Sequence, residues 1–241
     1  MKRFAAVIVL VFLSPLIAEF LSGSMSFAQV AAMPVTLAMY GGGVVLIREV
    51  VRRTGRGWPS ILLLALAYAL VEEGVADQSL FNPDFDGLRL LDPGFLPALG
   101  IGVPWTIYVL AIHAIWSIAV PIALAESLFP SIRNEPWTGY AGTVVAALVY
   151  GAGAAAIASY FAKTFFASPA QIAASAIGIV VLAAAAFVPR RMPPKRPGPA
   201  PKPPIVGLAS LIATSAFVQL YGLGVRLWPW QAVAGGLALL L

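Results

Sequence analysis

Long apolar runs, most of them long enough to cross a bilayer, are the feature that most constrains how this chain folds. A membrane-spanning helix needs about 20 apolar residues. The chain offers seven such runs and a shorter eighth, at residues 4–22, 29–51, 59–80, 103–128, 139–161, 170–188, 205–223 and 229–241. This pattern predicts an all-α, polytopic helical membrane bundle with seven full spans and a partial eighth. The short final run indicates either a half-span or a natural chain that continues further.

The composition excludes several other classes of protein. Only 10% of the 241 residues are charged and 60% are hydrophobic, whereas a soluble domain carries about 25% charge. A soluble enzyme, a disordered chain and a nucleic-acid-binding domain are therefore excluded, and the expected partner is the lipid bilayer. The chain has no cysteine and a single histidine, which excludes thiolate and His-rich metal motifs. We expect no metal or other cofactor.

The basic residues predict the orientation, because cytoplasmic loops collect Lys and Arg. If the spans alternate, twelve of the fifteen Lys and Arg residues fall on the side of the N-terminus and three on the other. We therefore expect a bacterial-type cytoplasmic membrane with the N-terminus in the cytoplasm. Residues 1–28 also resemble a signal peptide. Its removal would take away the first span, and we interpret this segment as a retained span.

A proline-rich segment divides the chain. Residues 189–204 contain eight prolines and five basic residues, a composition that cannot form a helix. We expect residues 1–188 to form a six-span membrane block, residues 189–204 an extended cytoplasmic linker, and residues 205–241 a C-terminal segment of one and a half spans.

Ionisable residues inside the apolar runs are the best pointers to function, because they are costly in hydrocarbon. At about 1.5 Å per residue, Glu19, the Glu72–Glu73 pair and His113 lie at similar depths, in the middle-to-outer half of the membrane. Two adjacent carboxylates do not both ionise readily there, so one is expected to carry a proton. We predict Glu72, Glu73 and His113 as catalytic residues.

Four further residues are predicted to bind a ligand beside them: Glu19, Asp77, Ser117 and Tyr40. Asp77 is one helical turn after Glu73, and Ser117 is one turn after His113. Pro121 cannot donate a hydrogen bond to the Ser117 carbonyl, which is thereby left free. Tyr40 precedes three consecutive glycines, which indicate either tight helix packing or a flexible segment.

The Glu72–Glu73 pair on one span, followed by His113 on the next, resembles the CAAX prenyl endopeptidases and bacteriocin-processing intramembrane proteases. The resemblance covers roughly residues 65–120. It implies a polytopic helical enzyme in which Glu72 or Glu73 activates a water molecule and His113 assists. Asp77 stands where that family has Arg, Val109 stands where it has Phe, and no second histidine follows.

Three classes of function agree with this sequence. The first is an intramembrane hydrolase that uses Glu72, Glu73 and His113. The second is a transporter or permease that uses the same groups as a proton or cation site. The third is a non-catalytic membrane subunit or scaffold, which would require a partner membrane protein.

Overall fold

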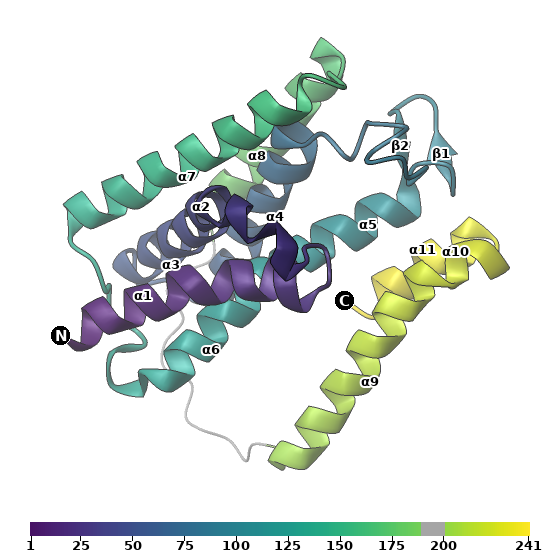
Figure 1. Ribbon diagram of the computed structural model, residues 1–241. Helices are drawn as coiled ribbons and strands as arrows, with labels where there is room; N and C mark the ends of the chain where they lie inside the picture. The colour runs from purple at the N-terminus through teal and green to yellow at the C-terminus, as the bar shows by residue number, and fades with distance from the viewer. Residues whose placement is uncertain (189–200) are drawn as a thin grey trace. The chain divides into compact units, whose positions relative to one another are not determined.

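The computed structural model describes residues 1–188 and 201–241, and this part of the chain is predominantly helical (Figure 1). Its sheet is a short antiparallel pair of strands, β1 (Phe95–Leu96) and β2 (Ile101–Gly102). The predicted all-α, polytopic membrane bundle is confirmed. The expected linker, 189–204, falls mostly on residues 189–200, which lie outside the described residues.

Six helical stretches among the described residues are long and apolar enough to cross a membrane. They are Lys2–Leu21, Phe27–Arg53, Trp58–Ala76, Val103–Leu128, Tyr140–Phe161 and Pro203–Gly222. Two shorter apolar helices, Pro169–Ala185 and Trp230–Leu239, match the expected runs 170–188 and 229–241. The first of these has 17 residues. It rises about 26 Å, slightly less than the roughly 30 Å of bilayer hydrocarbon.

Four of the six long stretches change helix type along their length, and Figure 1 labels their α-helical parts. The first two contain α1 (Lys2–Pro15), η1 (Leu16–Leu21), η2 (Phe27–Ala32), α2 (Met33–Thr36), η3 (Leu37–Gly41) and α3 (Gly42–Arg53). The next two contain α4 (Trp58–Val71), η4 (Glu72–Ala76), α5 (Val103–Ile112), η5 (His113–Ala119) and α6 (Val120–Leu128). The remaining helices are η6 (Pro130–Ile132), α7 (Tyr140–Phe161), α8 (Pro169–Ala185), α9 (Pro203–Gly222), α10 (Gly224–Leu227) and α11 (Trp230–Leu239).

The chain divides into two units by its internal contacts. The first unit is Met1–Gln78 with Leu110–Arg191, and the second is Ser79–Val109 with Met192–Leu241. In the second unit α9 packs against α10 and α11, and the Tyr108 ring stacks on that of Tyr221, with centroids 4.2 Å apart. All the residues predicted to form the site belong to the first unit.

The first unit is a bundle in which α4 packs against α8, α3 against α7, and η3 against both α1 and α7. Its core is mostly apolar, with the side chains of Leu10, Met39, Ile61 and Ile118 fully buried and Tyr68 packed among them. Helices in a bilayer gain little from hydrophobic burial against one another, so close van der Waals packing must hold them together.

Glycine supplies that close packing between the second span and α7. A methyl group on Gly153 would lie 2.5 Å from the backbone nitrogen of Met39, and one on Gly42 would lie 2.8 Å from the backbone nitrogen of Tyr150. These neighbours are backbone atoms, which cannot rotate away as a side chain can. The glycines after Tyr40 therefore serve tight helix packing, one of the two interpretations that their sequence allows.

We expect Gly153→Ala to lower the free energy of unfolding by about 1–3 kcal/mol, since the added methyl group overpacks the contact between α7 and η3. Gly151, on the same helix, has open space where its methyl group would lie. Gly151→Ala should therefore leave stability unchanged or raise it by up to about 1 kcal/mol. Reversible unfolding in mixed detergent micelles measures both variants, and equal stabilities would contradict the close contact.

Candidate functional site

His113 lies between the two adjacent carboxylates of the third span. Its Nε2 atom is 2.7 Å from Glu73 Oε1, and its Nδ1 atom is 2.9 Å from Glu72 Oε2. The side chains of Glu72 and Glu73 are 5% and 3% exposed, so both carboxylates are removed from solvent. The ring can face two carboxylates favourably only as an imidazolium, or if a facing carboxyl carries a proton.

Tyr40 extends this arrangement to a third carboxyl group. Its hydroxyl contacts Glu19 Oε1 and also Glu72 Oε1. A tyrosine hydroxyl has one proton and can donate only one hydrogen bond. The Tyr40 proton can therefore serve only one of these two carboxyl groups at a time. We call the series Glu19, Tyr40, Glu72, His113 and Glu73 the carboxylate–histidine chain.

Each member of the carboxylate–histidine chain lies in a π-helical segment. Glu19 is in η1, Tyr40 in η3, Glu72 and Glu73 in η4, and His113 in η5. Such segments are rare and frequently mark functional sites, because the extra residue in the turn redirects the side chains. Four of them meet here within one unit of the fold.

Proline explains part of this local geometry. Pro121 removes the donor that would pair with the Ser117 carbonyl, as the sequence predicts. The Ser14 hydroxyl of the first span donates to that carbonyl at 2.6 Å. Pro15 likewise deprives the Val11 carbonyl of its helical partner, and a methyl group on Gly41 would lie only 2.8 Å from that oxygen. The first span is therefore held closely against η3 and η5.

Aromatic rings enclose the carboxylate–histidine chain. The Tyr40 ring is nearly parallel to that of His113, with centroids 6.2 Å apart, and Tyr68 packs between Tyr40 and Tyr150. The Tyr68 hydroxyl is buried without a hydrogen bond of standard geometry, yet it interacts electrostatically with Glu72. Glu72 Oε2 also lacks a hydrogen bond of standard geometry, although it is close to His113.

The other predicted residues lie at the edge of this group. The Ser117 hydroxyl is 3.3 Å from His113 Nδ1. Asp77 follows the end of η4, and its backbone N–H donates to the Glu72 carbonyl at 2.9 Å. The carboxylates of Glu72 and Glu73 and the imidazole of His113 place one ligand atom each within 4.8 Å of the others, close enough to hold a metal ion, and Asp77 is not part of this group. The catalytic and binding roles of these residues stay predictions.

Sequence reasoning missed Ser14 and gave Tyr68 no role. Ser14 carries no signal, because a lone serine in an apolar run is ordinary and its partner is 103 residues away. Tyr68 did have a signal, since it lies one helical turn before Glu72 and shares its face.

A second buried polar cluster surrounds Arg48, whose side chain is fully buried. The guanidinium donates to Glu49 at 2.7 Å, lies 3.2 Å from Glu126, and its Cζ atom is 3.2 Å from the centroid of the Trp137 ring. Arg52 makes a bidentate pair with Glu126. Each of these charges lies beside one of opposite sign, which is the arrangement expected of a tie between helices.

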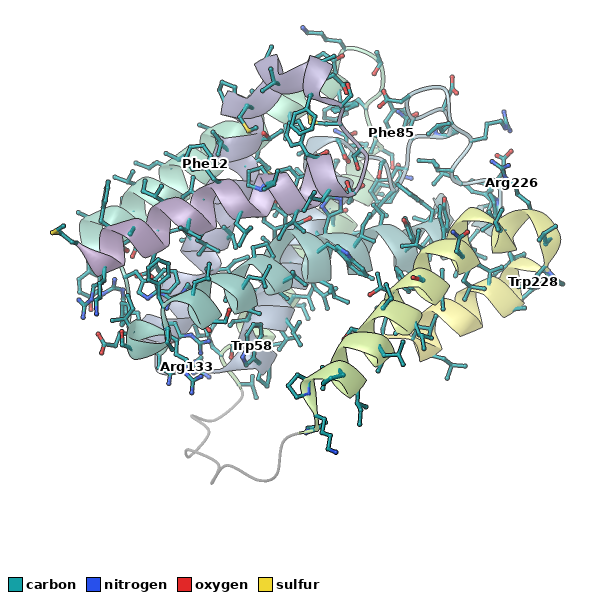
Figure 2. All side chains as sticks on the ribbon, turned by 60° about the horizontal axis from the view of Figure 1, so that its bottom comes forward. Phe12, Trp58, Phe85, Arg133, Arg226 and Trp228 are labelled. Carbon is teal, nitrogen blue, oxygen red and sulfur yellow. The ribbon has the colours of Figure 1, made fainter. Side chains whose placement is uncertain are left out.

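Two cavities occur beside these clusters. A polar cavity of about 410 Å³ is lined by Arg52, Glu126, Trp58 and Arg133, and Figure 2 labels the last two. An apolar cavity of about 320 Å³ extends along α3, α4, α7 and α8 from Phe187 to Tyr68 and Tyr150. The apolar cavity therefore reaches the aromatic wall of the carboxylate–histidine chain.

A family model described as an uncharacterized membrane protein family matches residues 8–240. The chain belongs to this family. No curated protein and no solved structure matches it. No match to the CAAX prenyl endopeptidases supports the resemblance of residues 65–120, which stays a prediction. The family match covers the whole carboxylate–histidine chain and establishes a multi-spanning membrane protein.

Proposed function

We propose that this membrane protein is a proton-coupled transporter or permease, in which the carboxylate–histidine chain carries the protons. The observation that supports this is the continuous series of short polar contacts from Glu19 through Tyr40, Glu72 and His113 to Glu73. Chains of Asp, Glu and His inside membranes are typical of proton relays in pumps and transporters.

The burial of the carboxylate–histidine chain suits such a relay. Glu19 is partly exposed, whereas Glu72 and Glu73 are buried. A proton that reaches Glu19 from an aqueous surface has an uninterrupted series of acceptors to follow into the bundle. The relay is a property of the first unit alone, because all five residues belong to it.

Tyr40→Phe tests the relay with the smallest change. The substitution removes only the oxygen that joins Glu19 to Glu72 and keeps the ring that stacks on His113. In proteoliposomes that hold a pH-sensitive dye, we expect its proton flux under an imposed pH gradient to fall at least about tenfold, as a barrier higher by about 1.4 kcal/mol requires.

The control for this experiment is Tyr160→Phe, which removes the same atom from an exposed tyrosine on α7. It should conduct protons as the natural chain does. Equal flux through Tyr40→Phe, or natural protein that moves no more protons than empty vesicles, would contradict the proposal.

A second candidate function is an intramembrane hydrolase. The 2.7 Å contact between Glu73 and His113 is the geometry of a general base and its partner. The apolar cavity that reaches Tyr68 offers a place for an apolar substrate beside Glu72. Release of a cleaved product from a membrane peptide would distinguish this activity from proton transport.

We also propose that the N-terminus is cytoplasmic, in a bacterial-type cytoplasmic membrane. Arg48, Arg52 and Arg53 belong to one connected network with Glu49 and Glu126, at the end of α3 where the positive-inside rule expects them. A partner membrane protein is required only if the chain is a subunit or scaffold rather than a transporter.

A further inference from the structure

We propose that Glu72, Glu73 and His113 bind one divalent metal ion of the zinc type. One oxygen of each carboxylate and one ring nitrogen of the histidine lie within 4.8 Å of one another. Zinc–oxygen and zinc–nitrogen bonds are about 2.0–2.2 Å long, so an ion between such atoms holds its ligands up to about 4.4 Å apart. His113 contacts Glu72 and Glu73 through different ring nitrogens, so one of these contacts must open and the imidazole must turn for the three donors to reach a common ion.

The balance of charge in the carboxylate–histidine chain favours a cation. Three carboxyl groups meet a single imidazole, so negative charge exceeds positive charge among these five residues unless protons or a cation are bound. Uncompensated charge in a buried site is strongly unfavourable. A divalent ion supplies compensation at the point where the two most buried carboxylates meet.

Two neighbouring buried polar atoms of this site have hydrogen-bonding capacity that the protein does not fill with standard geometry. The Tyr68 hydroxyl and Glu72 Oε2 both lack a hydrogen bond of standard geometry, and the two groups interact with each other. Tyr68 is 3% exposed, and buried polar groups without partners are rare in native structures. A metal ion would bind Glu72 Oε2, and a water molecule bound to that ion would form a hydrogen bond with the Tyr68 hydroxyl.

The donor types select the class of ion. One imidazole with two carboxylates suits Zn²⁺, Mn²⁺ and Fe²⁺, whereas Ca²⁺ and Mg²⁺ prefer oxygen ligands alone. Three protein ligands leave an open position, as in zinc sites that bind water or substrate. A bound ion would displace the protons that the same carboxyl groups carry in the proposed relay. The metal site uses the same residues as the proposed proton relay, but it does not require that the protein transports protons.

The chain offers an unusually clean binding experiment, because it has one histidine and no cysteine. Protein purified with a histidine-free affinity tag is titrated with Zn²⁺ in detergent by calorimetry. We expect one ion per chain, and an affinity at least about a hundredfold lower in His113→Gln and in Glu73→Gln. X-ray absorption by the bound zinc should show one imidazole nitrogen, which only His113 can supply.

The matched control is Glu135→Gln, which removes an exposed carboxylate that pairs with Arg3 and should bind zinc normally. Natural protein that binds no zinc saturably, binds it without an imidazole signal, or binds it equally well in folded His113→Gln would overturn the metal site. The spectroscopic result needs no variant, so it holds even where a substitution impairs folding. Proton flux measured without zinc tests the relay separately, so the two proposals can fail independently.

Discussion

Replacing Arg48 by methionine is expected to lower the free energy of unfolding by about 3–5 kcal/mol, the usual cost of removing one partner from a buried ion pair. The guanidinium is fully buried and lies against Glu49, Glu126 and the ring of Trp137. It also donates to the backbone carbonyls of Arg133 and Glu135. Methionine fills much of the volume but removes the donor to these two carbonyls and the positive charge between Glu49 and Glu126.

The measurement is unfolding by a denaturing detergent, followed through tryptophan fluorescence. Arg3→Met is the matched control, since it removes an arginine whose ion pair with Glu135 is half exposed. Such pairs contribute about 0–1 kcal/mol. If the Arg48 variant loses no more stability than this control, the network around Arg48 does not hold the end of the bundle together.

The helical architecture was predictable because the bilayer imposes it. A chain that crosses hydrocarbon must satisfy its backbone hydrogen bonds within each span, so apolar length alone identifies helices. The stretch Lys2–Leu21 corresponds to the predicted run 4–22, and Val103–Leu128 to the run 103–128. The ends of the helices were predicted less accurately than their existence. For example, α8 ends at Ala185, three residues before the predicted apolar run does.

The convergence of the site was predictable only in part. Depth could be counted along each span, and it placed Glu19, Glu72 and His113 at one level. Which spans are neighbours depends on packing between distant residues, such as Gly153 against Met39. The bridge through Tyr40 could not be predicted from the sequence, because the direction of the Tyr40 side chain depends on the π-helical turn in η3.

The pairing of Glu126 shows the same limit. Its position near the end of the fourth apolar run predicts a pair with Arg133 or Arg48. The structure gives it Arg52, with Arg48 as a second neighbour. Side chains of this length reach several partners, so only the rotation of each helix about its axis decides among them.

His113→Leu is expected to destabilise the protein by about 3–5 kcal/mol, because it leaves Glu72 and Glu73 buried side by side without the imidazole between them. The triple variant Glu72→Leu, Glu73→Leu, His113→Leu should behave differently. A protein in which a whole buried ionic group is replaced by apolar side chains of similar volume is often as stable as the natural protein, or more stable. We expect its free energy of unfolding to lie within about 2 kcal/mol of the natural value.

That contrast separates a functional site from a tie between helices. If the cluster exists to join η4 and η5, the triple variant should lose more than about 2 kcal/mol of stability, because it lacks the contacts of His113 with Glu72 and Glu73 that join these segments. If the cluster exists for proton transfer, the triple variant folds well and its proton flux falls to the level of empty vesicles. Detergent unfolding and proteoliposome flux on the same preparations decide between these outcomes, and a stable triple variant with normal flux would exclude both roles.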